Sequence, residues 1–310
     1  MRRLCEILRA LFNFAFWRDF AENDVREESR MLHEYESLVT LDSITIVVPV
    51  KNEEKNLPEC LENLHGFKNV VIVDSGSTDR TLEIAAEFGR EVVQFKWNGE
   101  FPKKRNWVLR NYKFKTLWVM FLDADERITP AFCLALDRIL HSTTCNAFIC
   151  YYDNWFMGRM LRHGDAMRKT AILRLGTGEY EKIDEHGWSN LDMEIHEHLQ
   201  VEGEIGVIKA RLEHHDKRSF ESYYKKHEEY ANWEANRYKA LQGDFSKLTK
   251  RQRIKYGLIK KWWFGFAYFC VCYFLKGGIL DGKPGYMFAR NKWRYFANVR
   301  RKINDIGGTK

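Results

Sequence analysis

The chain has 310 residues, of which 45% are hydrophobic and 15% aromatic. This composition supports a buried core and excludes a largely disordered chain, and the length allows one large α/β domain with appendages or two small domains. The net charge of +7 is unevenly distributed, because residues 247–302 contain fifteen Lys or Arg residues and one acid, so this segment calls for an anionic partner such as phospholipid, lipid-linked phosphate or nucleic acid.

Residues 1–43 are predicted to form an N-terminal arm. Its first twenty residues place Leu4, Ile7 and Leu8 at helical spacing among basic residues, which predicts an amphipathic helix. A signal peptide is the rival interpretation, but Arg9 and Arg18 interrupt the apolar run and no cleavage pattern follows. The seven cysteines are scattered and form no CxxC pair, so a disulfide framework or zinc site is not expected and a reducing compartment fits.

Residues 44–243 are predicted to form one α/β domain. Apolar, β-branched runs alternate with helical patterns, and the runs are SITIVVPV, NVVIVD, EVVQF and TLWVMFLD. This alternation predicts a Rossmann-like, mostly parallel sheet with helices on both faces. Ligands of such sheets bind beyond the carboxyl ends of the strands.

The turn after the first strand contains Pro49, Val50, Asn52 and Glu53. A dinucleotide-binding turn needs glycines at this point, and their absence argues against a dehydrogenase. The residues alone allow an ordinary helix entry as well as a ligand-binding turn.

The second strand ends at Asp74, which is followed by the small-residue turn 75–79. An acid at this place suits hydrogen bonding to a base or a ribose. Ser77 or Asp79 is expected to cap the next helix, and both roles are compatible.

The fourth strand delivers three acids in four positions: Asp123, Asp125 and Glu126, with Ala124 between them. Such a cluster after an apolar strand is costly unless a cation pairs with it. Mg²⁺ or Mn²⁺ is the natural partner, because hard cations bind carboxylate oxygens and bridge diphosphates. A solvated loop is the alternative.

Three further side chains are candidates for chemistry. Arg105, on a predicted helix, could bind a phosphate or lie on a solvated basic face. The segment 194–198 reads EIHEH, which lacks the HExxH spacing of a zinc protease, and Glu197 within it could act as a general base. His214 could complete a metal shell. Each of these, taken singly, is more often structural.

Residues 244–310 are predicted to form a helical, basic and aromatic extension. From Trp262 to Leu275 the chain has fourteen uncharged residues, whereas a membrane-spanning helix needs about twenty. Trp and Tyr beside Lys and Arg favour peripheral attachment to an anionic membrane. A buried core helix is the alternative. A nucleic-acid surface is not expected, because it would interleave solvated basic and aromatic residues.

Together these motifs resemble family 2 glycosyltransferases with the GT-A fold. The resemblance runs from Ile44 to Tyr230 and rests on four segments: ITIVVPVKNEEKNL, VIVDSGSTDRT, KKRN and FLDADE. Within the family the chain looks closest to bacterial β-glucosyltransferases that build lipopolysaccharide core or surface glycans. That similarity includes Arg174, the pair His196-Glu197, and His214 followed by Arg218.

The resemblance implies a donor site for a nucleotide-diphosphate sugar, expected to be UDP-linked. Asp74 and the turn 49–53 would hold the nucleoside. Asp125, helped by Asp123 and His214, would hold Mn²⁺ or Mg²⁺ against the diphosphate, where the ion stabilises the departing charge. Arg105 and Arg174 would share that charge.

The resemblance also implies an inverting transfer. Glu197 would remove the proton from a glycan or glycolipid hydroxyl as it attacks the anomeric carbon. The runner-up is transfer to a polyprenyl phosphate, where no base is needed. The expected location is cytoplasmic, on the inner face of the cytoplasmic membrane.

Overall fold

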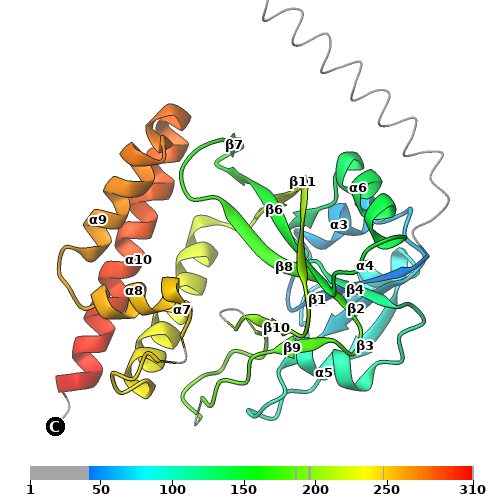
Figure 1. Ribbon diagram of the computed structural model, residues 1–310, viewed down its shortest axis with the longest axis horizontal. Helices are drawn as coiled ribbons and strands as arrows, with labels where there is room; N and C mark the ends of the chain where they lie inside the picture. Colours follow the sequence, from blue (N-terminus) through cyan, green and yellow to red (C-terminus); the bar gives the residue numbers. More distant parts are fainter. Residues whose placement is uncertain (1–41, 186, 195–196, 247, 309–310) are drawn as a thin grey trace, which may run out of the picture.

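The computed structural model describes residues 42–185, 187–194, 197–246 and 248–308. The predicted N-terminal arm lies outside these residues except for positions 42 and 43, which form a turn. Figure 1 shows two parts that pack together: the sheet with helices α3 to α6, and a group of later helices, α7 to α10, coloured yellow to red.

The first half of the sheet is parallel, as its apolar runs predict. Its strands are β1 (Ile44–Val50), β2 (Val70–Asp74), β3 (Glu91–Gln94) and β4 (Trp118–Phe121). They lie in the order β3-β2-β1-β4, and every pairing among them is parallel. All seven residues of β1 and all four of β4 are buried, which is the pattern of strands covered on both faces.

Helices cover both faces of this half. One face packs on α3 (Leu57–Asn63), α4 (Thr81–Glu87) and α6 (Pro130–Leu140) in a core that includes Ile46, Leu61 and Phe132. The other face packs on α5 (Lys104–Asn111) in a core that includes Val47, Val71 and Val108. The predicted α/β class is confirmed, and the parallel strands end together at one edge of the sheet.

The second half of the sheet continues from β4 with antiparallel partners. The remaining strands are β5 (Glu126–Arg127), β6 (Ala147–Phe156), β7 (Arg159–Leu161), β8 (Met167–Arg174) and β11 (Ile205–His215), while β9 (Gly178–Tyr180) and β10 (Leu199–Val201) form a separate pair. Strand β8 runs antiparallel to both β4 and β6, and β11 runs parallel to β6. Strand β5 pairs with the end of β11, so His214 lies opposite Glu126.

The C-terminal extension is helical, as predicted. It comprises α8 (Lys250–Leu258), α9 (Phe264–Cys270), η1 (Val271–Leu275), η2 (Gly278–Asp281) and α10 (Gly282–Gly308), packed against α7 (Phe220–Ala240). Ala231 and Ala235 of α7 meet Phe296 and Val299 of α10 in a small core of their own. The extension therefore has one face buried against α7.

Candidate functional site

The turns after β1 and β2 are joined by hydrogen bonds. Asn52 has a φ of 56°, in the left-handed region that Asn tolerates better than most residues. Its side-chain oxygen accepts from the amide of Thr78 at 2.7 Å, and its own amide donates to the hydroxyl of Ser77 at 2.9 Å. The predicted nucleoside turn is therefore held in place by the second turn.

Asp74 holds its own turn together. Its carboxylate is fully buried and accepts hydrogen bonds from the amides of Gly76 (3.0 Å) and Ser77 (3.1 Å) and from the hydroxyl of Ser77. Asp79 accepts from the amide of Thr81 at 3.0 Å, but the N-cap residue of α4 is Arg80, so neither Ser77 nor Asp79 occupies the cap as expected. Pro49 and Val50 are buried in β1, whereas Asn52 is exposed and Glu53 half-buried in the turn that follows. A nucleoside contact by Asp74 stays a prediction.

Asp123 lies between two cations. Arg105 donates to Oδ1 at 2.7 Å, and Lys169 of β8 donates to Oδ2 at 2.8 Å. Lys169 also lies 2.8 Å from Glu126 Oε1, and Ala124 between the acids is buried. Burial raises the pKa of Asp123, but Lys169 and Arg105 outweigh it and hold that pKa well below its usual range. Burial raises the pKa of Glu126 to about 7.

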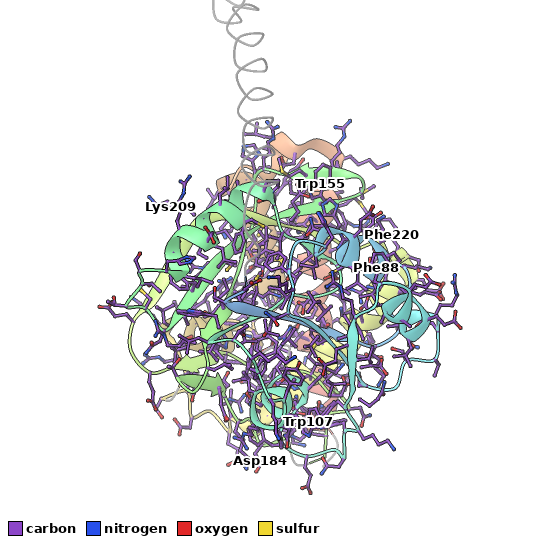
Figure 2. The ribbon with its side chains drawn as sticks, turned by 90° about the vertical axis from the view of Figure 1, so that its right-hand side faces the viewer. Phe88, Trp107, Trp155, Asp184, Lys209 and Phe220 are labelled. Carbon is purple, nitrogen blue, oxygen red and sulfur yellow. The ribbon has the colours of Figure 1, made fainter. Side chains whose placement is uncertain are left out.

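Asp125 faces a different set of cations. His214 Nε2 lies 3.6 Å from Oδ2 of Asp125, and Arg218 donates to the same oxygen at 3.1 Å. Burial raises the pKa of Asp125, yet His214, Lys226 and Arg218 together bring it well below its usual range. The ring of His214 is oriented by its Nδ1, which is 3.0 Å from the side-chain oxygen of Asn154. The next ring, that of His215, stacks on Trp155, which Figure 2 labels near the top of the molecule.

Among the described residues, no group of three His, Cys, Asp or Glu side chains has an arrangement that could hold a metal by itself. The donor set nevertheless suits Mg²⁺ or Mn²⁺. Such ions are commonly held by one or two carboxylates together with substrate phosphates. Asp125 and His214 supply an oxygen and a nitrogen at one point, and Asp123 lies two residues away. These residues fit a metal ion that is held jointly by the protein and a bound diphosphate better than one held by protein ligands alone.

Arg174 is not part of this cluster, contrary to the prediction. It pairs with Trp118 at the first residue of β4, and its guanidinium lies 4.8 Å from the Trp118 ring centroid. The acids lie at the opposite end of that strand, roughly 16 Å away at about 3.3 Å per residue. Because β8 is antiparallel to β4, its other end reaches the acids, and that end carries Lys169. The sequence prediction missed Lys169, since the antiparallel pairing cannot be read from local pattern.

Glu197 lies on a neighbouring wall of the site. It is buried, and Lys103 donates to it at 2.8 Å. Lys103 also pairs with Glu185, whose carboxylate accepts from the indole of Trp233 on α7. Glu197, Arg105 and Lys169 line one cavity of about 370 Å³. This cavity connects the candidate base with the cations that hold Asp123. His196, its partner in the predicted pair, lies outside the described residues.

Glu194 has a structural role. Its carboxylate accepts from the backbone amides of Arg105 (2.8 Å) and Asn106 (3.0 Å), at the first turn of α5, and its carbonyl accepts from the guanidinium of Arg105. A carboxylate at this place satisfies two helix amides that have no partner within the helix. Arg105 is thereby fixed with its other terminal nitrogen, Nη2, directed at Asp123.

Comparison with known proteins shows which family the chain resembles. Residues 45–198 match the family model described as glycosyl transferase family 2. An uncharacterized glycosyltransferase of Rickettsia conorii is 25% identical over 248 residues, which are 78% of this chain and 83% of that protein. A lipopolysaccharide core biosynthesis glycosyltransferase of Rhizobium meliloti is 26% identical over 169 residues, 50% of this chain and 56% of its own length.

A solved structure also shows similarity. It is the glucosyl-3-phosphoglycerate synthase of Mycobacterium tuberculosis, in complex with Mn²⁺, UDP-glucose and phosphoglyceric acid. It is 24% identical, covers 36% of this chain and 44% of its own chain, and has a TM-score of 0.30.

Proposed function

The chain belongs to glycosyl transferase family 2, and from this premise we propose that it is an inverting, metal-dependent enzyme of surface-glycan synthesis. It takes a sugar from a nucleotide-diphosphate donor, expected to be UDP-linked, and transfers it to a hydroxyl of a glycan or glycolipid. The observation that carries the proposal is the pair of acids, Asp123 and Asp125, which stand at the carboxyl end of β4 with separate cations against each.

The donor's diphosphate would lie at Asp125, where Asp125 and His214 would hold Mn²⁺ or Mg²⁺. When bound, the ion supplies Lewis-acid stabilisation of the departing diphosphate. Asn154 keeps the ring of His214 in position through its contact with Nδ1. The guanidinium of Arg218 pairs with Asp216, Asp125 and Glu53, at 2.7, 3.1 and 3.3 Å. A bound diphosphate offers this guanidinium a stronger anionic partner, so Arg218 would bind it directly.

The acceptor would occupy the cavity that Glu197 lines. Glu197 would take the proton from the attacking hydroxyl, which then forms its bond to the anomeric carbon as the bond to the diphosphate breaks. Lys103 holds the Glu197 carboxylate in one orientation. Positioned bases of this kind act without forming a covalent sugar intermediate, so the anomeric configuration inverts.

A role in lipopolysaccharide or surface-polysaccharide synthesis draws support from the Rhizobium meliloti relative, whose name states that role for that protein. A second acceptor class is a polyprenyl phosphate, and the apolar and basic surface of the C-terminal helices favours a lipid-linked acceptor of either kind. The two differ in whether Glu197 is needed. We place the enzyme in the cytoplasm, on the inner face of the cytoplasmic membrane.

A panel of nucleotide sugars tests the proposal. Thermal shift with Mn²⁺ should identify one donor class that stabilises the protein, and that donor should be hydrolysed slowly without an acceptor. The anomeric configuration of the transferred sugar, read by NMR coupling constants, should be opposite to that of the donor. Retention of configuration would overturn the inverting mechanism, and the absence of any stabilising nucleotide sugar would overturn the donor site.

A further inference from the structure

The C-terminal helices carry a concentration of exposed apolar side chains. Ten of the nineteen large hydrophobic residues that are exposed in the described chain lie between positions 262 and 293. The most exposed are Leu275 (81%), Trp262 (76%), Leu280 (72%) and Phe274 (56%). A soluble surface rarely leaves so many large apolar groups together, which points to a binding surface.

We call the exposed apolar side chains between positions 262 and 293 the aromatic face, and ring contacts join several of them across α9 and α10. Phe266 of α9 contacts Trp293 of α10, with ring centroids 5.3 Å apart. Phe269, which is buried beneath them, contacts both Trp293 and Tyr286, at 6.1 and 6.0 Å. The opposite sides of α9 and α10 are buried against α7 through residues such as Phe264 and Val299. Each helix therefore has one side in a core and the other exposed.

Basic side chains border the aromatic face at both ends. Lys260 and Lys261 precede α9, and Lys283 and Arg290 lie on α10, all of them exposed. None of these four forms an ion pair with another described residue. Residues 247–302 carry fifteen basic residues against one acid. A second copy of the chain would bring these charges against one another, whereas an anionic bilayer would neutralise them.

We propose that the aromatic face is a docking surface for a bilayer that contains anionic lipid. Trp and Tyr sit at the headgroup level of membranes, and exposed Leu and Phe insert just below it. No single helix in the described part of the chain is long and apolar enough to cross a membrane, although Phe264–Leu275 and Gly278–Ile306, bent by 74°, pass that test as a pair. Their burial against α7 favours a helix pair that lies on the bilayer.

The aromatic face is fixed to the catalytic domain. The amide of Gly164 donates to the carbonyl of Lys276 at 2.9 Å, and His163 lies 3.0 Å from Asp281. Both partners belong to the loop after β7, and Figure 1 shows β7 beside the start of α10. Strand β6, which pairs with β7, carries the Asn154 that contacts His214. Docking would thus hold the site in a defined orientation to the membrane.

Vesicle sedimentation of the full chain, without donor or acceptor, tests the proposal independently of sugar transfer. The probes are vesicles of phosphatidylcholine alone and with rising fractions of phosphatidylglycerol. The test variant is Phe274→Ser/Leu275→Ser/Leu280→Ser, on the aromatic face. The control variant is Leu117→Ser/Val207→Ser/Ile254→Ser, which removes three exposed apolar side chains outside that face (54%, 48% and 56% exposed).

The wild type should bind better as phosphatidylglycerol rises and should be released by high salt. The affinity of the aromatic-face variant for these vesicles should be lower by about tenfold or more. The control variant should bind like the wild type. Equal thermal unfolding of both variants shows that the fold survives. Failure of the wild type to bind anionic vesicles, or equal binding by both triple variants, would overturn the proposal. A third outcome would also overturn it: light scattering shows that the wild type is a dimer and the aromatic-face variant a monomer, while both bind vesicles equally. The aromatic face would then be a protein interface.

Discussion

The guanidinium of Arg218 donates to Oδ2 of Asp125 at 3.1 Å, across 93 positions of sequence. Arg218 comes from the segment between β11 and α7, and Asp125 follows β4. The contact places a cation from the end of the catalytic domain beside the acids at the carboxyl end of β4. Burial raises the pKa of Asp125, but Arg218, together with His214 and Lys226, lowers it below its usual range.

We expect Arg218→Met to weaken donor binding. A hydrogen bond to a charged group contributes about 1.5–3 kcal/mol, which corresponds to a rise of roughly 10- to 100-fold in the donor KM. The variant should change the donor KM more than the free energy of unfolding, because His214 still lies beside the Asp125 carboxylate. Arg211→Met is the control, since Arg211 is exposed on β11 and pairs with Asp153 of β6. Equal kinetics of the two variants would place the diphosphate elsewhere.

Glu197→Gln tests the base. The amide keeps the shape of the side chain but cannot accept the proton, so kcat should fall by roughly 10²–10⁴ while the donor KM is retained. Glu181→Gln is the matched control, because Glu181 lines the same cavity and pairs with His198 instead. Transfer at the normal rate by Glu197→Gln would favour a phosphate acceptor, which needs no base.

Glu194→Ala should destabilise the fold. It leaves the amides of Arg105 and Asn106 buried without an acceptor, at a cost of about 1–3 kcal/mol for each such group. Urea unfolding should show the loss as a lower midpoint. The control is Glu179→Ala, which removes an exposed ion pair with Arg110 and should cost less than about 1 kcal/mol. Equal midpoints would show that α5 does not depend on Glu194.

His227 predicts a pH dependence of stability. Burial lowers the pKa of His227 from 6.5 to about 4. A histidine whose pKa is lower in the folded state stabilises the fold above the unfolded value, and that contribution disappears as pH falls from about 6.5 towards 4. The whole gap corresponds to at most about 3 kcal/mol. His227→Phe should therefore lose less stability than the wild type between pH 7.5 and 5, measured by urea unfolding. Parallel losses would show that the pKa of His227 is the same in the folded and unfolded states.

Local sequence pattern predicted the strands and helices that carry the site. It did not predict how distant segments pair. Runs such as ITIVVPV and WVMF gave buried parallel strands, so Asp74 and Asp123 were correctly expected at strand ends. Arg174 was assigned wrongly and Lys169 missed for one reason: the direction of β8 against β4 decides which end meets the acids. The exposed side of α9 was likewise hidden, because a run of apolar residues does not show which of them a neighbouring helix will cover.

The central claim is that Asp125 forms the metal and diphosphate site of a sugar transferase. The most direct test is a titration of Mn²⁺ against release of the nucleotide from the donor that the panel identifies, for the wild type and Asp125→Asn. We expect saturable activation of the wild type and loss of activity in EDTA. Asp125→Asn should lower the activity by roughly 10³-fold or more while the variant remains folded. Full activity in EDTA, or in Asp125→Asn, would contradict the central claim.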